Sequence, residues 1–341
     1  MKLVLDKRSE AILKRQLSTI DEGDFYEGHQ ALRTVQEIAN YIRAYHNGFS
    51  ITVDDVADIL HLSMSSFLYA GAKELLKHDQ VGSVIDLLHY IIKIYKEQNI
   101  PITEESRERI TSIMIELPTN DKEILSVIIA ATNWSKQLGN NPGGDPILHH
   151  FFGTFLSAAP NYYEAEKHFL FGTLESSMAL GRMLFAWSKT LPNCDKGVFL
   201  CRGVFQYLAL GNILFATNCY DAFLKAAKKD GEITVQMEAE TEYGNSKMEY
   251  IESSISNGFC ALVISAVKKS DRNPLSPASK VFENCRKRYL PVFGETEESF
   301  AKVLDEIAEL YFGIKVQKQV NLLNTLMNSL FAPNNGGAIE N

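Results

Sequence analysis

The stretch EGDFYEGHQALRTV, residues 22–35, begins as a tight turn and continues as a helix. Gly23 can adopt the backbone angles that end one helix, and the Asp24 side chain can accept hydrogen bonds from the N–H groups that open the next. Two aromatic residues, Phe25 and Tyr26, follow at the point where both helices leave the turn. Aromatic side chains at that point can wedge between the helices. The stretch therefore predicts the corner of a helical hairpin.

A second stretch, APNYYEAEKHF at residues 159–169, repeats this arrangement in the other half of the chain. In both stretches a turn is followed by two aromatic residues, a small residue and an apolar residue four positions later. Tyr162, Ala165 and Phe169, with Gly153 upstream, lie where a tetratricopeptide-type repeat places the residues that let antiparallel helices approach closely. Because the period is irregular, we predict an all-α fold, an α-solenoid of degenerate tetratricopeptide-like hairpins.

Length and charge limit the class of protein. The 341 residues are 45% hydrophobic, which is ample for a sizeable core, and the net charge of −8 argues against a general nucleic-acid binder. No apolar run approaches the ~20 residues that span a bilayer, and charges interrupt the first residues too early for a signal peptide. Five cysteines without a C-x-x-C pair indicate neither a disulfide framework nor a zinc site. We expect a cytoplasmic protein.

A Gly- and Pro-rich loop, GNNPGGDP at residues 139–146, divides the chain. We place a boundary there, between an N-terminal helical half, residues 1–145, and a C-terminal helical half, residues 146–331. The polar last residues, 332–341, are expected to be a flexible tail.

One segment of the C-terminal half departs from the helical pattern. Two short runs with alternating polarity, residues 233–237 and 247–251, flank a polar Gly-Asn turn, so we predict a β-hairpin at about residues 232–252. A lone two-stranded ribbon is marginal in water. The ribbon would persist only if it packs on the helices or is completed by a partner strand, so it suggests a site for a partner. The equally open alternative is a ribbon that only connects two helices and binds nothing.

Motifs for catalysis are missing from the sequence. It contains no phosphate-binding glycine loop, no G-x-S-x-G and no H-E-x-x-H, so we predict no catalytic residue, metal or cofactor. Glu164 and His168 share a helix face and are expected to form a surface pair. The basic cluster CRKRY at 285–289 is interpreted as a solvated helix face, and Trp134 and Trp187 as core or inter-helix contacts.

Three segments carry a resemblance to a known family: residues 22–34, residues 140–173 and the run LLNTLMNSLF at 322–331. Together they resemble the fungal Golgi-to-ER traffic protein four family, a scaffold subunit of the pathway for guided entry of tail-anchored membrane proteins. The likeness spans nearly the whole chain in order. Its most specific part is the GDP-x-LH block followed by YYEAE-x-HF-x-x-G.

The resemblance implies a scaffold that is not an enzyme. Its N-terminal helices would bind the dimeric ATPase that targets tail-anchored proteins. Its C-terminal half, with the hairpin, would hold a ubiquitin-like adaptor that recruits a client-loaded tetratricopeptide co-chaperone. Neither nucleic-acid binding nor direct insertion into a membrane is implied.

Within that frame, some residues are candidates for partner contacts. Asp86 could meet a basic residue of the ATPase, although a charge at a helix N-terminus is an equally good interpretation. Arg33, Arg43 and Lys77 could steer the encounter by charge. The candidate adaptor contacts of the ribbon are Ile233, Val235, Met237, Met248 and Tyr250.

Two other classes of protein stay open. One is a helical scaffold subunit of an assembly like the proteasome lid, the signalosome or an initiation factor, which would need a winged-helix module near its end. The other is an enzyme whose site carries no known motif, which a screen for bound metal or nucleotide would reveal.

Overall fold

The computed structural model describes residues 14–15, 18–33, 53–119, 122–191, 193–241 and 244–315. Over these residues the protein is helical apart from a single two-stranded sheet, which confirms the predicted all-α solenoid with one β-hairpin. The chain forms two compact units, Met1–Leu148 and His149–Asn341. The expected tail lies outside the described residues.

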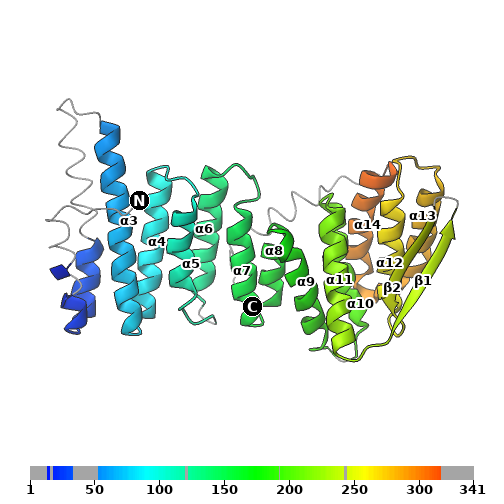
Figure 1. The fold of residues 1–341 in the computed structure, drawn as a ribbon, viewed down its shortest axis with the longest axis horizontal. Helices are drawn as coiled ribbons and strands as arrows, with labels where there is room; N and C mark the ends of the chain where they lie inside the picture. Colours follow the sequence, from blue (N-terminus) through cyan, green and yellow to red (C-terminus); the bar gives the residue numbers. More distant parts are fainter. Residues whose placement is uncertain are drawn as a thin grey trace, which may run out of the picture. The chain divides into compact units, whose positions relative to one another are not determined.

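The first unit is a series of helices. Those that the structure describes are the helical residues 18–21, the helix of residues 25–33, α3 (Val53–Lys77), α4 (Val81–Glu97), α5 (Glu104–Met114) and α6 (Ile124–Leu138). Short turns connect α3 to α4 and α4 to α5. The helix α4 is central, because it packs against both α3 and α6 (Figure 1). Asp79 and Asn99 have positive φ angles of 55° and 52°, the left-handed conformation that commonly follows the end of a helix.

The first predicted corner is present in this unit. Gly23 has φ 94°, and the Asp24 carboxylate accepts a hydrogen bond from the Glu27 N–H at 3.3 Å. The Phe25 ring packs on the His78 ring, with centroids 5.1 Å apart, whereas the Tyr26 side chain is 76% exposed. The expectation of a structural role is therefore met by Phe25 and is wrong for Tyr26. Successive helical residues point about 100° apart, so only one of the pair can face the neighbouring helix.

The second predicted corner joins α7 (Pro146–Ala158) to α8 (Tyr162–Leu170). A Cβ atom added to Gly153 would lie 2.6 Å from the buried Phe169 ring, so the glycine lets the two helices approach closely. Tyr162 packs against Trp187, whereas Tyr163 is half-exposed. The small and aromatic positions thus act as the pattern predicted.

Besides the hairpin, seven further elements are described in the second unit. They are α9 (Leu174–Ser188), α10 (Lys196–Ala209), α11 (Ile213–Lys229), α12 (Ile255–Lys268), α13 (Pro277–Tyr289), the 3₁₀ helix η1 (Leu290–Thr296) and α14 (Glu297–Phe312). The helix α10 lies at the centre and packs against α9, α11, α12 and α14. Leu200, Val204 and Phe205 of α10 are completely buried, as expected for a helix covered on most sides.

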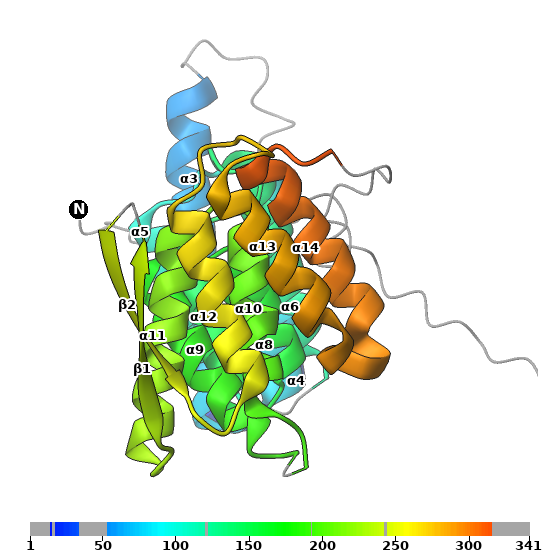
Figure 2. The same cartoon turned by 90° about the vertical axis from the view of Figure 1, so that its right-hand side faces the viewer.

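The β-hairpin consists of β1 (Thr234–Thr241) and β2 (Gly244–Ile251), within the predicted range. Figure 2 shows the hairpin beside α11 and α12. The Tyr220 hydroxyl of α11 donates a hydrogen bond to the Glu249 carbonyl at 2.6 Å, and the Ile251 N–H donates to Asn257 Oδ1 of α12 at 2.9 Å. These bonds and the buried Ile251 side chain supply the packing that an isolated ribbon lacks.

One prediction about polar residues is wrong. His168 does not form a surface pair with Glu164, because its ring is buried and its Nδ1 lies 3.0 Å from Nδ1 of the buried His149. The reason is that His168 shares its side of α8 with Ala165 and Phe169, the side that packs on α7. Glu164 forms an ion pair with Lys167 instead.

The predictions for the two tryptophans are confirmed, and that for the CRKRY cluster is confirmed in part. The Trp134 side chain is completely buried and its Nε1–H donates to the Ile100 carbonyl at 3.0 Å, while Trp187 contacts Phe199 between helices. In the CRKRY cluster Lys287 and Arg288 are exposed as expected. Arg286 departs from that interpretation, since it forms an ion pair with Asp305 of α14.

Candidate protein-interaction sites

The first candidate site is a cluster of charged and aromatic side chains in the first unit, which we call the Asp86 cluster: His29, Arg33, Asp86 and Tyr90. Asp86 Oδ2 lies 2.9 Å from His29 Nε2 and 3.3 Å from Arg33 Nη1. The Arg33 guanidinium also lies over the Tyr90 ring, 5.6 Å from its centroid. The cluster thus joins α4 to the helix of residues 25–33.

The position of Asp86 argues against a role at the helix N-terminus. It is the sixth residue of α4, and the first turn of that helix contains no acidic residue. The effect of a helix dipole falls off beyond the first turn. The Asp86 and Arg33 side chains are each 44% exposed, so a charged partner can reach the pair without a change in the packing of the helices.

Lys77, another predicted steering cation, is not part of this cluster. Lys77 is 66% exposed and donates hydrogen bonds to Glu74 at 2.7 and 2.9 Å, which raises the pKa of Lys77. Arg43 lies outside the described residues.

Beside Lys77 lies the one group of potential metal ligands in the described part of the chain. Asp21, Glu74 and His78 have ligand atoms within 4.8 Å of one another. Glu74 already forms an ion pair with the Lys77 ammonium group, and the three potential ligands are at least partly exposed. We interpret the three side chains as part of a surface group of ion pairs.

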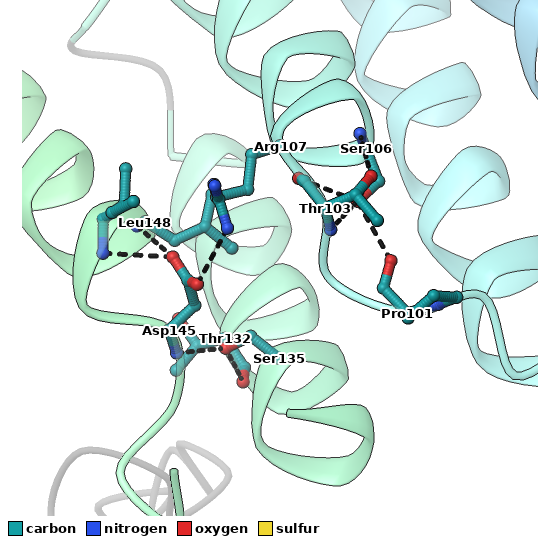
Figure 3. Close-up of polar contacts among 9 residues, drawn as sticks. Pro101, Thr103, Ser106, Arg107, Thr132, Ser135, Asp145 and Leu148 are labelled. Atoms are coloured by element: carbon teal, nitrogen blue, oxygen red, sulfur yellow. Dashed lines mark hydrogen bonds and ion pairs between the residues drawn. The ribbon is translucent and has the colours of Figure 1, made fainter. Parts of the chain in front are cut away.

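The GDP-x-LH block forms a polar joint within the first unit (Figure 3). One Asp145 oxygen accepts hydrogen bonds from the N–H groups of Ile147 and Leu148 at 3.0 and 2.9 Å, and so caps the start of α7. The other oxygen lies 3.1 Å from Arg107 Nη1 of α5, and the Asp145 N–H donates to Ser135 Oγ of α6. This aspartate therefore joins three helices and has a structural role.

The YYEAE-x-HF block places a buried carboxylate in the second unit. Glu166 is 2% exposed, and both of its oxygens accept hydrogen bonds from Arg202 Nε of α10, at 2.7 and 2.6 Å. Burial raises the pKa of Glu166, and the Arg202 charge opposes that shift. No sequence pattern indicates this pair, because Arg202 lies 36 residues away along the chain.

The His149–His168 pair lies in the same packed region of α7 and α8. The His168 ring also contacts the Phe152 ring edge-on, at 5.5 Å between centroids. Burial and the neighbouring His149 lower the pKa of His168 well below its ordinary value. The ring is therefore neutral at physiological pH, and the pair belongs to the core.

The second candidate site is the hairpin. Ile233, directly before β1, is 69% exposed, and Val235, Met248 and Tyr250 are half-buried. In the register Val235 pairs with Tyr250, and Met237 with Met248; the Met237 side chain lies outside the described residues. The structure thus brings the predicted adaptor contacts into one ribbon.

The two edges of the hairpin differ. The Glu252 N–H donates to the Ile233 carbonyl, and hydrogen-bonded pairs alternate along an antiparallel ladder. The backbone groups of Thr234 and Gln236 therefore point away from β2. The matching outward groups of β2, at Glu249 and Ile251, are covered by α11 and α12. Among the described residues nothing bonds to the outer edge of β1, so this edge can accept a further strand.

Comparisons with known proteins agree on one family. The model of the family described as Golgi to ER traffic protein 4 matches residues 62–331. The Golgi to ER traffic protein 4 of Schizosaccharomyces pombe is 28% identical, over 95% of this chain and 96% of its own. Its homolog in Xenopus tropicalis is 24% identical, over 95% of this chain and 87% of its own.

A solved structure supports the fold. The crystal structure of C. therm. Get4 matches with a TM-score of 0.75 at 24% identity, and the match covers 98% of this chain and 99% of that one. The family description points to traffic between Golgi and ER rather than to an enzyme. No helix in the described ranges is long and apolar enough to cross a membrane.

Proposed function

Because this chain belongs to the Golgi to ER traffic protein 4 family, we propose that it is a non-catalytic scaffold for targeting tail-anchored membrane proteins. In this proposal the first unit binds the targeting ATPase, and the second unit binds a ubiquitin-like adaptor through the hairpin. The adaptor in turn recruits a client-loaded tetratricopeptide co-chaperone, and the complex works in the cytoplasm.

The observation that carries the proposal is the uncovered edge of β1. The edge of this two-stranded ribbon, the one sheet among the described residues, presents unpaired backbone groups, which an extended segment of a partner can satisfy. The half-buried Val235 of β1 and the exposed Ile233 directly before it add apolar contacts beside this edge. A ribbon that merely connected helices would need neither feature.

The adaptor site is tested with the substitution Val235→Asp. A charge near the start of β1 should abolish binding of the adaptor, measured by isothermal titration, while circular dichroism shows intact helices. Leu275→Asp is the matched control, because Leu275 is 78% exposed and lies outside the hairpin. Unchanged affinity for the Val235→Asp variant would reject the hairpin as the adaptor site.

The ATPase site is tested with Asp86→Arg. This change replaces the centre of the Asp86 cluster with a cation facing Arg33, and should weaken binding to the ATPase from the same organism, titrated with and without ATP. Glu97→Arg is the matched control, since Glu97 lies on the same helix at a similar exposure of 47%. Equal losses in both variants would show a general charge effect instead of a site.

The alternative scaffold class receives no support from the described residues. A winged-helix module ends in a ribbon that follows its helices, whereas β1 and β2 are followed by α12, α13 and α14. A screen for bound metal and nucleotide on the purified chain tests the remaining enzyme class.

A further inference from the structure

A hollow of about 590 Å³, which we also call the groove, opens between α9 and α11 in the second unit. Part of its lining is apolar: Met178 of α9 and the two alanines Ala222 and Ala226 of α11. The alanines stand one helical turn apart, so their short side chains leave room along the groove for the side chains of another segment.

Three cations also line the hollow. Arg182 comes from α9, and Lys225 and Lys229 follow each other by one turn on α11. All three side chains are exposed. Arg182 makes no ion pair or hydrogen bond with any residue that the structure describes.

Two acidic residues line the hollow as well, but they offset these cations only in part. Asp230 forms an ion pair with Lys189 at 2.6 Å, which lowers the pKa of Asp230. Asp221 is then the one carboxylate of the lining left to offset the three cations. The hollow is therefore locally cationic in a chain whose net charge is −8.

The side of α11 that holds the hairpin adjoins the side that lines the groove. Lys228, next to Lys229 in the sequence, forms an ion pair with Glu249 of β2 at 2.6 Å. Asp221 lies close enough to Glu249 that the two charges interact. The helix α11 thus carries the cationic groove on one side and the hairpin anchors Tyr220 and Lys228 on the adjoining side.

We propose that the groove between α9 and α11 binds an acidic segment of the same adaptor that adds to the hairpin. This inference rests on the proposed function. Carboxylates of that segment would lie between Arg182 on one side and Lys225 and Lys229 on the other, with an apolar side chain against Met178. Opposite charge across the groove then selects the partner and speeds its encounter.

The test titrates the full-length chain with the purified full-length adaptor. Arg182→Glu and Lys229→Glu should each weaken binding by about tenfold, and the double variant should lose most of the salt dependence of the affinity. Lys287→Glu on α13 makes the same change of charge at an exposed position away from the groove, and should bind like the parent. Circular dichroism confirms that the helices of each variant are intact.

The outcomes separate this inference from the proposed function. If the groove variants keep the parent's affinity and salt dependence while Val235→Asp abolishes binding, the groove inference is wrong and the hairpin site stands. If Lys287→Glu weakens binding as much as the groove variants, the attraction is general and the groove is again rejected. If Val235→Asp and the groove variants all bind like the parent, both proposals fall.

Discussion

Acid should destabilise the second unit through the buried His149–His168 pair. His168 is buried, and its pKa lies well below the ordinary value of 6.5 because burial and His149 both oppose its protonation. In the unfolded chain the same imidazole takes up a proton at about its ordinary pKa. Between these two pKa values the unfolded state binds one more proton than the folded state, so stability must fall as the pH falls.

The magnitude follows from linkage. The stabilising contribution is fully present above pH 6.5, the ordinary pKa, and disappears as the pH drops below it. One proton corresponds to about 1.4 kcal/mol per pH unit once the unfolded histidine is mostly charged. Going from about pH 7.5 to about pH 5 should therefore cost about 2 kcal/mol of unfolding free energy through His168 alone.

The assay compares urea unfolding of the parent and of His168→Gln over this pH range. Glutamine keeps a donor and an acceptor for His149 but cannot titrate, so the loss of stability in acid should be about 2 kcal/mol smaller in the variant. Titratable groups away from the His149–His168 pair are common to both proteins and cancel in the difference. Parallel stability curves for the two proteins would refute the reasoning, because they would mean that the folded protein protonates His168 as readily as the unfolded chain.

Three further substitutions test the packing. Arg202→Met removes the partner of the buried Glu166 and should cost about 3 kcal/mol at neutral pH, less in acid where the carboxyl takes up a proton; a pH-independent loss would contradict this. Gly153→Ala forces a methyl group against the buried Phe169 ring and should lower stability by about 1–3 kcal/mol; a neutral result in thermal unfolding would show that the ring can move. Asp145→Ala removes the cap of α7 and should cost about 1–2 kcal/mol, whereas Asp145→Asn should retain most of the cap.

Periodicity and turn chemistry in the sequence were enough for the class of fold. The corner at Gly23 and Asp24, the close approach at Gly153 and the hairpin near residues 232–252 all depend on residues near one another in the chain. For such local features the conformational preference of each residue and its immediate neighbours decide the structure. The identity of the partners and of the contact residues remains a prediction.

Side-chain environments were predicted less well. His168 was expected on the surface, and Tyr26 between helices, because a helical pattern says which residues share a face but not which face is covered. The Asp86 cluster illustrates the same limit: the sequence suggested Asp86 and Arg33 separately, and their pairing 53 residues apart depends on how two helices pack.

The sequence by itself thus determined the helical hairpins, the ribbon and the family, because these depend on local patterns and on the order of motifs along the chain. Only the tertiary structure decided that β1 keeps an uncovered edge, that Arg202 neutralises Glu166, and that cations of α9 and α11 meet around one groove. These features arise from contacts between residues far apart in the chain. The packing that fixes them is the sum of many long-range contacts, which no single stretch of sequence encodes.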